Sequence, residues 1–179
     1  MDRVTIIPLK SVNGVPFGAK KEEVRKVLGS DYENSLETIE ENKDVFEMEE
    51  VKKVEETFKE LYKHIGKNPE DFEWPDISEF EEDNDTYNLV QIEYEDDEFV
   101  SATVYAHNAK HLTIGDNDCS DLELAKILTL ATDFEWIEED TSWVSKSKQV
   151  GLYCPEDKYK IDSITFGCPG YYNQIYDEE

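Results

Sequence analysis

Alternating apolar and polar residues mark most of the second half of the chain. The stretch from 87 to 106, YNLVQIEYEDDEFVSATVYA, places β-branched and aromatic residues on two arms around Asp96 and Asp97. Two such arms joined by a polar pair predict a β-hairpin that turns at the aspartates. The same reasoning predicts further short strands over residues 3–18, 111–115, 134–139, 141–147, 150–154 and 160–166.

A helical spacing of apolar residues first appears in KKEEVRKVLG, residues 20–29. Val24, Val27 and Leu28 fall on one side of the predicted helix, and Gly29 follows its end, where glycine is common. We therefore expect a short helix with these three side chains turned inward.

A second and longer helix is predicted over residues 46–66. Its apolar positions are spaced three and four apart, which is typical of a single buried stripe. The stripe consists of Val51, Val54, Phe58, Leu61 and Ile65. Further along, Ser120 and Glu123 form a capping-box pattern, which predicts a third helix running to about Ala131.

The order of these elements indicates the fold class. Helices alternate with antiparallel hairpins, and no strand–helix–strand rhythm repeats, so we predict an α+β fold. Antiparallel sheets of short strands would pack with two or three helices. We expect one domain over residues 1–179, with any subdivision near an acidic connecting segment at 67–86. Both halves run strand, glycine, helix, strands, the order that a distant internal duplication would give.

Composition adds an extreme charge to this picture. The chain has 179 residues, a net charge of −26 and 12% aromatic residues. This aromatic content is too high for a disordered chain. The charge disfavours direct binding of nucleic acid or of an anionic membrane, and it favours a basic protein partner.

The negative charge is concentrated in one part of the chain. Between Lys67 and Lys110 there are 14 acidic residues and no Lys or Arg. Phe72, Trp74 and Phe80 are interleaved with the acids, as expected of an interface in which aromatic anchors sit within a charged rim. The alternative interpretation is a solvated loop and an exposed hairpin whose charge serves solubility.

Calcium is a competing explanation for the acidic runs. DNDCSD, residues 116–121, has the spacing of a calcium loop, but Asp121 and Ile127 stand where an EF-hand needs Gly and Glu. The run that begins at Asp83 fails in the same way, with Tyr94 at its twelfth position. Turn residues are the simpler interpretation of both runs, and a calcium-binding module remains an alternative.

Sequence patterns that would indicate a catalytic site are weak. His107 and His111 are four apart but lie between β-type runs, and Glu156–Lys158 resembles half of a nuclease site without a basic groove around it. The sequence has neither a nucleophile elbow nor a phosphate-binding glycine loop. We therefore expect no enzymatic activity and no cofactor or metal.

The cysteines and the N-terminal residues indicate in which cellular compartment the protein is expected. Cys119, Cys154 and Cys168 are odd in number and lack CxxC spacing, so neither a disulfide framework nor a zinc site is expected. The first residues lack the long apolar stretch of a signal peptide. We expect a protein of the reducing cytoplasm.

Two stretches resemble a known group of proteins. SVNGVPFGAKKEEVRKVLG, residues 11–29, resembles the opening of bacterial immunity proteins that are encoded beside toxins of polymorphic and contact-dependent inhibition systems. VGLYCPEDKYKIDSITFGCPGYY, residues 150–172, looks like their closing strands. The matching residues of the first stretch are Gly14, Phe17, Gly18, Glu22, Glu23, Val24, Arg25, Leu28 and Gly29. The resemblance implies a protein that binds a cognate toxin and blocks its active site. Many such toxins are nucleases with basic grooves.

These observations lead to one hypothesis with two alternatives. We predict a non-catalytic intracellular inhibitor that binds a basic protein partner, a cognate bacterial toxin with nuclease activity, and blocks its active site. The alternatives are a phage-type DNA mimic that blocks a nucleic-acid-binding protein, or a calcium-binding module. The predicted partner-binding residues are Glu70, Asp71, Phe72, Glu73, Trp74, Asp76, Glu79, Phe80, Glu81, Glu82, Asp83, Asp85, Glu95, Asp96, Asp97 and Glu98.

Overall fold

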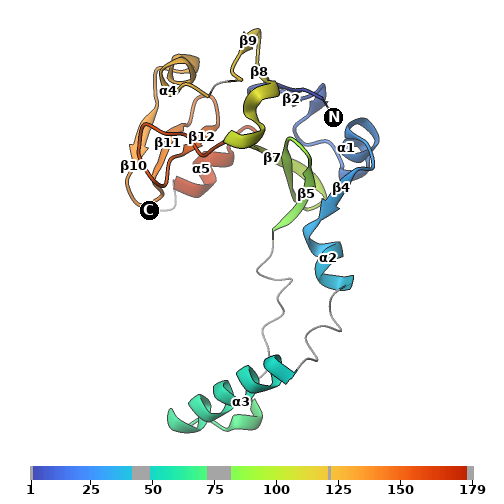
Figure 1. The fold of residues 1–179 in the computed structure, drawn as a ribbon, viewed down its shortest axis with the longest axis vertical. Helices are drawn as coiled ribbons and strands as arrows, with labels where there is room; N and C mark the ends of the chain where they lie inside the picture. Colours follow the sequence, from blue (N-terminus) through green and yellow to red (C-terminus); the bar gives the residue numbers. More distant parts are fainter. Residues whose placement is uncertain (1, 42–48, 72–81, 121, 177–179) are drawn as a thin grey trace. The chain divides into compact units, whose positions relative to one another are not determined.

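The structure, a computed structural model, describes residues 2–41, 49–71, 82–120 and 122–176 (Figure 1). It has an α+β fold with two sheets and several short helices, which confirms the predicted class. The chain divides into two compact units, one formed by Met1–Glu33 with Asn84–Glu179 and the other by Asn34–Asp83. The larger unit holds the core.

The larger sheet has eight strands in the order β10-β11-β12-β13-β7-β6-β5-β4. Neighbours from β10 through to β6 are antiparallel. The predicted series of four short strands after residue 130 is confirmed as β10 to β13. The strand bounds are β4 (Tyr32–Asn34), β5 (Asp83–Tyr87), β6 (Gln91–Glu95), β7 (Glu98–Tyr105), β10 (Glu135–Ile137), β11 (Ser142–Ser145), β12 (Val150–Tyr153) and β13 (Ser163–Gly167).

Strands β6 and β7 form the predicted hairpin. Glu95 pairs with Glu98, which leaves Asp96 and Asp97 as a two-residue turn. Their φ angles are 51° and 64°, the left-handed values that a type I′ turn requires. Asp is among the residues that adopt this conformation at modest cost, so the turn that the sequence predicts forms without glycine.

The second sheet has five strands in the order β3-β2-β1-β8-β9. The predicted strands at 3–18 and 111–115 are confirmed within it, and β1 pairs with β8 in parallel. The bounds are β1 (Val4–Ile7), β2 (Ser11–Val12), β3 (Val15–Pro16), β8 (Leu112–Ile114) and β9 (Asn117–Asp118). The short 3-10 helix η4 (Ala106–His111) leads from β7 into β8.

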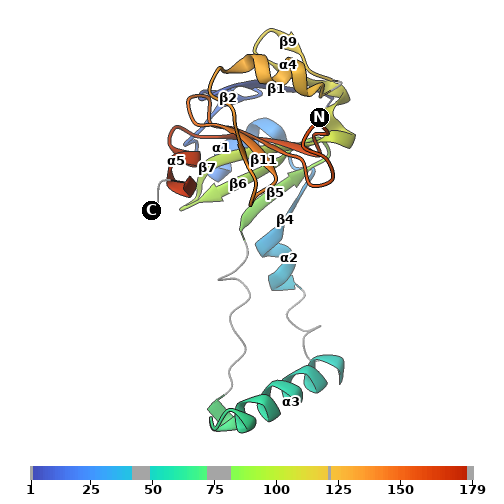
Figure 2. The same cartoon turned by 90° about the vertical axis from the view of Figure 1, so that its left-hand side faces the viewer.

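A single apolar cluster joins the two sheets. Buried side chains of β1 and β8, such as Ile6 and Ile114, belong to the same cluster as Ile92, Phe99 and Phe166 of the larger sheet. Figure 2 shows the five-stranded sheet and α4 on one side of β6 and β7. The core therefore lies against one face of the larger sheet.

Helix α5 (Tyr171–Tyr176), which the sequence did not predict, packs on the other face. A Cβ atom built on Gly151 would lie 2.1 Å from the hydroxyl oxygen of Tyr172. One built on Gly167 would lie 2.4 Å from the Cβ of Tyr171. The two glycines thus make room for the helix.

Helix α1 (Lys21–Leu28) confirms the first predicted helix, and Gly29 follows it with a φ of 103°. Val24 is buried and Leu28 packs against the core. Val27, predicted to turn inward, is instead 59% exposed because the helix buries only a narrow stripe.

The predicted helix from Ser120 to Ala131 is wrong at its start. Leu122 has a φ of 44°, a left-handed conformation that an α-helix cannot contain. Helix α4 (Leu124–Ile127) therefore begins after Glu123, with no side-chain cap, and continues as the 3-10 turn η5 (Leu128–Leu130). The predicted capping box does not form.

The smaller unit contains α2 (Ser35–Glu41), α3 (Glu49–His64) and the 3-10 turn η2 (Pro69–Asp71). Helix α3 confirms the second predicted helix as far as the described residues reach. The prediction that its apolar stripe is buried is wrong for the side chains described. Phe58, Leu61 and Ile65 are 41%, 53% and 60% exposed.

Helix α2 was missed because its cap is an isolated asparagine. The Asn34 side-chain oxygen accepts a hydrogen bond from the Glu37 backbone N–H at 3.0 Å, a typical N-cap. The same side chain donates to the Asp83 carboxylate at 2.9 Å. One residue thus starts the helix and ties it to the far end of its own unit.

Candidate binding site

The structure describes only part of the predicted partner-binding set. The following predicted residues lie outside the described part of the chain: Phe72, Glu73, Trp74, Asp76, Glu79, Phe80 and Glu81. Glu70, in η2, and Glu82 are exposed. Asp71 is the last residue of η2 and Asp83 the first of β5.

The structure brings four predicted residues together at the tip of the β6–β7 hairpin. Glu95, Asp96, Asp97 and Glu98 are consecutive and all exposed. Of these, only Glu98 forms an ion pair with a described residue: its carboxylate lies 3.1 Å from the Lys20 ammonium. Because both side chains are about half exposed, this pair contributes little to stability and does little to neutralise the tip.

The hairpin tip is held in place by the segment that leads into α1. The Lys21 backbone N–H donates to the Asp97 carbonyl at 3.0 Å, and the Lys20 ammonium donates to the Asp96 carbonyl at 3.4 Å. Phe99 exchanges backbone hydrogen bonds with Gly18 and Ala19 at 2.8 and 2.9 Å. The acidic turn is therefore pre-organised by its own backbone contacts.

Asp85, also predicted to bind a partner, is not at the surface. Its side chain is 0% exposed, and its two carboxylate oxygens accept hydrogen bonds from Arg25 at 2.7 and 2.8 Å. The Tyr94 hydroxyl donates a third at 2.9 Å. Burial and the Asp85 charge together raise the pKa of Tyr94 well above its usual value. Asp85 therefore anchors α1 to the sheet from within.

Arg25 belongs to the stretch that resembles immunity proteins. Its guanidinium lies 4.3 Å from the centroid of the Tyr32 ring while it holds Asp85. The ion pair with Asp85 and the contact with the Tyr32 ring together fix the angle of α1 against β4 and β5. The arginine of this stretch thus has a structural role.

A second group of polar side chains lies on the face of the larger sheet that α5 partly covers. The Glu93 carboxylate accepts hydrogen bonds from the hydroxyls of Ser101 and Tyr171, the latter at 2.8 Å. Thr103 and Thr165 share a hydrogen bond of 2.8 Å nearby. The sequence analysis did not single out these residues, although their alternation with core residues along the strands could have indicated a shared polar face.

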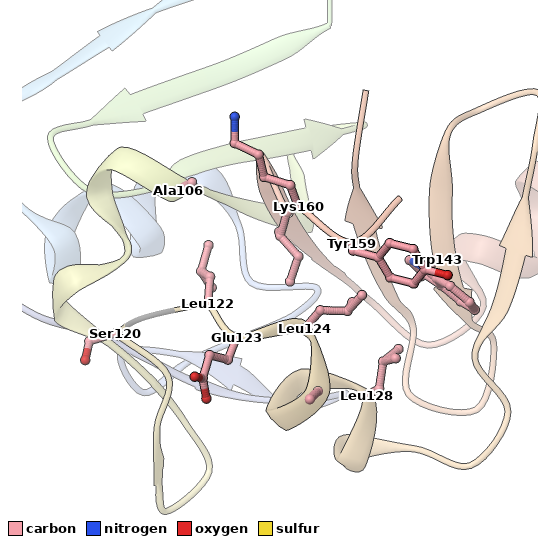
Figure 3. A pocket seen from close by; sticks show the side chains of 11 residues that line it. Ala106, Ser120, Leu122, Glu123, Leu124, Leu128, Trp143, Tyr159 and Lys160 are labelled. Carbon is pink, nitrogen blue, oxygen red and sulfur yellow. The ribbon is translucent and has the colours of Figure 1, made fainter. Parts of the chain in front are cut away.

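An open groove of about 770 Å³ lies between α4 and the segments around Trp143 and Tyr159 (Figure 3). Leu122, Leu124 and Leu128 lie on one side of it, with Trp143 and Tyr159 on another. Its remaining lining residues are Ala106, Ser120, Glu123, Ala125, Lys160 and Ile161. Among the described residues, this lining is mainly apolar.

Possible metal ligands and nucleophiles are dispersed. Within the described residues no group of three or more His, Cys, Asp or Glu side chains is placed to hold a metal. His107 is exposed and stacks on Tyr105 with ring centroids 5.8 Å apart. Burial, followed by the nearby charges of Asp157 and Asp162, raises the pKa of the Cys154 thiol to about 11, so this thiol stays protonated at neutral pH.

The two acidic runs considered as calcium loops have other roles. Asp118 ends β9 and accepts a hydrogen bond from the Ser120 backbone N–H at 3.0 Å, as expected of a turn residue. The run that begins at Asp83 forms strand β5.

No helix among the described residues has both the length and the apolar composition to cross a membrane. Compared with known proteins, the chain matches no family model, no curated protein and no solved structure.

Proposed function

We propose that this chain is a non-catalytic binding protein that neutralises a basic protein partner, a bacterial toxin nuclease whose active site it blocks. The observation that carries this proposal is the exposed, pre-organised acidic tip at Glu95–Glu98. It stands in a chain whose net charge is −26.

The tip has the properties that charge-driven recognition needs. Glu95, Asp96 and Asp97 form no ion pair with any described residue, so their charge is available to a partner. Because the turn is already held by Lys20 and Lys21, little loop entropy is lost on binding. The negative field of the whole chain would accelerate association with a basic surface.

In the proposed mechanism, the tip carboxylates occupy the positions where substrate phosphates would lie in the partner's basic groove. Asp85 takes no part, since it is buried and paired. A nanomolar complex requires about 12 kcal/mol, which charge alone does not supply, so apolar anchors must contribute. The resemblance of residues 11–29 and 150–172 to immunity proteins supports the choice of a toxin as partner.

The test uses amide replacements that remove charge and preserve shape. Glu95→Gln, Asp96→Asn and Asp97→Asn are combined in one variant, because Asn also tolerates the left-handed turn conformation. A control variant with the same net charge combines Asp116→Asn, Glu56→Gln and Glu60→Gln, three exposed acids elsewhere. Both are compared with the wild-type chain.

Partners are captured from lysate of the source organism at low and moderate salt, identified, purified and assayed for nuclease activity. We expect one dominant basic nuclease, inhibited by an equimolar amount of wild-type chain and of the control. The tip variant should bind it at least about tenfold more weakly, which corresponds to about 1.4 kcal/mol. Equal binding by the tip variant, or binding without inhibition, would contradict the proposal. Inhibition of several unrelated DNA-binding proteins would indicate a DNA mimic instead.

A further inference from the structure

Strand β10 (Glu135–Ile137) is an outer strand of the eight-stranded sheet. It pairs with β11 on one side, and no other described strand pairs with it. An outer strand directs the N–H and C=O groups of alternate residues away from the sheet. It has neither a proline nor a lysine to block further pairing. This edge can accept another strand.

On the core side of this edge lies a pair of tryptophans. The rings of Trp136 and Trp143 are 5.5 Å apart at an angle of 58°. Their indole N–H groups donate to the Glu138 carboxylate at 2.6 Å and to the Lys158 carbonyl at 2.8 Å. Since both donors are satisfied within the chain, the rings are fixed in orientation and offer apolar surface to a partner. Trp143 also lines the groove of Figure 3.

On the opposite side of the same edge lies a small hollow of about 120 Å³. It is lined by Asp133, Glu135, Ile137, Val144 and Lys146. The Asp133 carboxylate is held there by hydrogen bonds of 2.7 to 2.8 Å from the Ser145 hydroxyl and from the backbone N–H and hydroxyl of Ser147. The edge thus has an apolar surface on one face and, on the other, a hollow lined by two carboxylates and one lysine.

The charge around this edge is mainly negative, although Lys146 also lines the hollow. Between residues 133 and 145 there are five acidic residues and no Lys or Arg. Glu135, Glu138, Glu139 and Asp140 are exposed. The strand and its turn are therefore complementary to a basic segment.

We propose that β10 binds an extended basic segment of a partner protein, which adds to the sheet as a ninth strand. Side chains of an added strand alternate between the two faces. Apolar side chains would pack on Trp136 and Trp143, and the intervening Lys or Arg side chains would enter the hollow at Asp133 and Glu135. This surface is separate from the hairpin tip, and the inference shares with the proposed function only the basic character of the partner.

The probe is a short, end-capped, fluorescein-labelled peptide of alternating lysine and valine. Because any polycation is attracted to so acidic a chain, a control peptide has the same composition with lysines and valines in separate blocks. Two further peptides carry N-methyl groups on one or the other set of alternate residues, which removes their ability to donate to a strand. Binding to the full chain is measured by fluorescence anisotropy at about 150 mM salt, where long-range attraction is screened.

We expect the alternating peptide to bind at least about tenfold more tightly than the block peptide. One of the two methylated peptides should lose this advantage, because only one set of N–H groups faces β10. If the block peptide, or both methylated peptides, bind as tightly as the alternating peptide, then charge alone is responsible and the inference is overturned.

Two variants locate the site on the chain. Trp136→Ala should weaken binding of the alternating peptide by about thirtyfold, as for an aromatic hot spot, and Glu135→Lys should weaken it by about tenfold or more. The hairpin-tip amide variant should change it by less than about threefold, which separates this inference from the proposed function. Unchanged binding by Glu135→Lys would overturn the inference even if Trp136→Ala fails to fold.

Discussion

At the scale of single residues, the carboxylates of strand β5 and of the β6–β7 turn have different roles that depend on burial. The Asp85 side chain is fully buried and paired with Arg25, whereas Asp96 and Asp97 are exposed at a turn. A buried ion pair is sensitive to loss of one partner, because the other is then left charged and unpaired. Exposed carboxylates contribute little to stability and are available for binding.

This contrast leads to a prediction for Asp85. Asp85→Asn should lower the free energy of unfolding by about 3 kcal/mol, since the Arg25 guanidinium loses the charge of the buried carboxylate that holds it. Replacing both partners, with Arg25→Met and Asp85→Leu, should cost less than the single change. Urea unfolding followed by far-UV circular dichroism measures both. Asp97→Asn serves as a surface control and should change stability by less than about 0.5 kcal/mol. A larger loss in the double variant than in Asp85→Asn would contradict this account.

At the scale of elements, the sequence predicts most strands but misses β4, β5 and β9, and it predicts helix boundaries less well. The β6–β7 hairpin follows from local alternation and a polar pair, both of which are visible in the sequence. The helix predicted from Ser120 is wrong at its start because Leu122 adopts a left-handed conformation. Leucine at this position gives no sequence signal for such a conformation. The inward position of Asp85 depends on Arg25, which is 60 residues away in the chain. Likewise, the groove beside Trp143 is lined by residues from distant segments of the chain. The local spacing of apolar residues does not predict which distant segments come together.

The packing of α5 on the sheet gives a second prediction. Gly151→Ala should destabilise the chain by about 1–3 kcal/mol, because the added methyl group would overlap the Tyr172 hydroxyl. Tyr172→Leu removes the ring atoms that the methyl group would meet. The cost of Gly151→Ala should therefore be smaller in a Tyr172→Leu background, and thermal unfolding of all four chains in a double-mutant cycle measures the difference. Equal costs in both backgrounds would mean that α5 does not rest on Gly151.

At the scale of the whole molecule, charge and fold oppose each other. A net charge of −26 on 179 residues favours expansion, and only 18 Lys and Arg residues offset 44 acids. The core that joins the two sheets has to overcome this repulsion. Such a balance is compatible with a protein that binds a basic partner, because complex formation would remove the repulsion and stabilise the fold.

The balance predicts how stability depends on ions. Raising sodium chloride from about 10 mM to 150 mM shortens the Debye length from about 30 Å to about 8 Å, so the melting temperature should rise by several degrees. Choline chloride should act equally, because screening does not depend on the identity of the cation. Calcium chloride at matched ionic strength should then add no saturable increase, since Asp118 acts in a turn and the residues from Asp83 to Tyr87 form a strand. Scanning calorimetry in the three salts measures these changes in melting temperature. A further rise that saturates at micromolar calcium would favour the calcium-binding alternative, whereas equal curves would contradict that alternative.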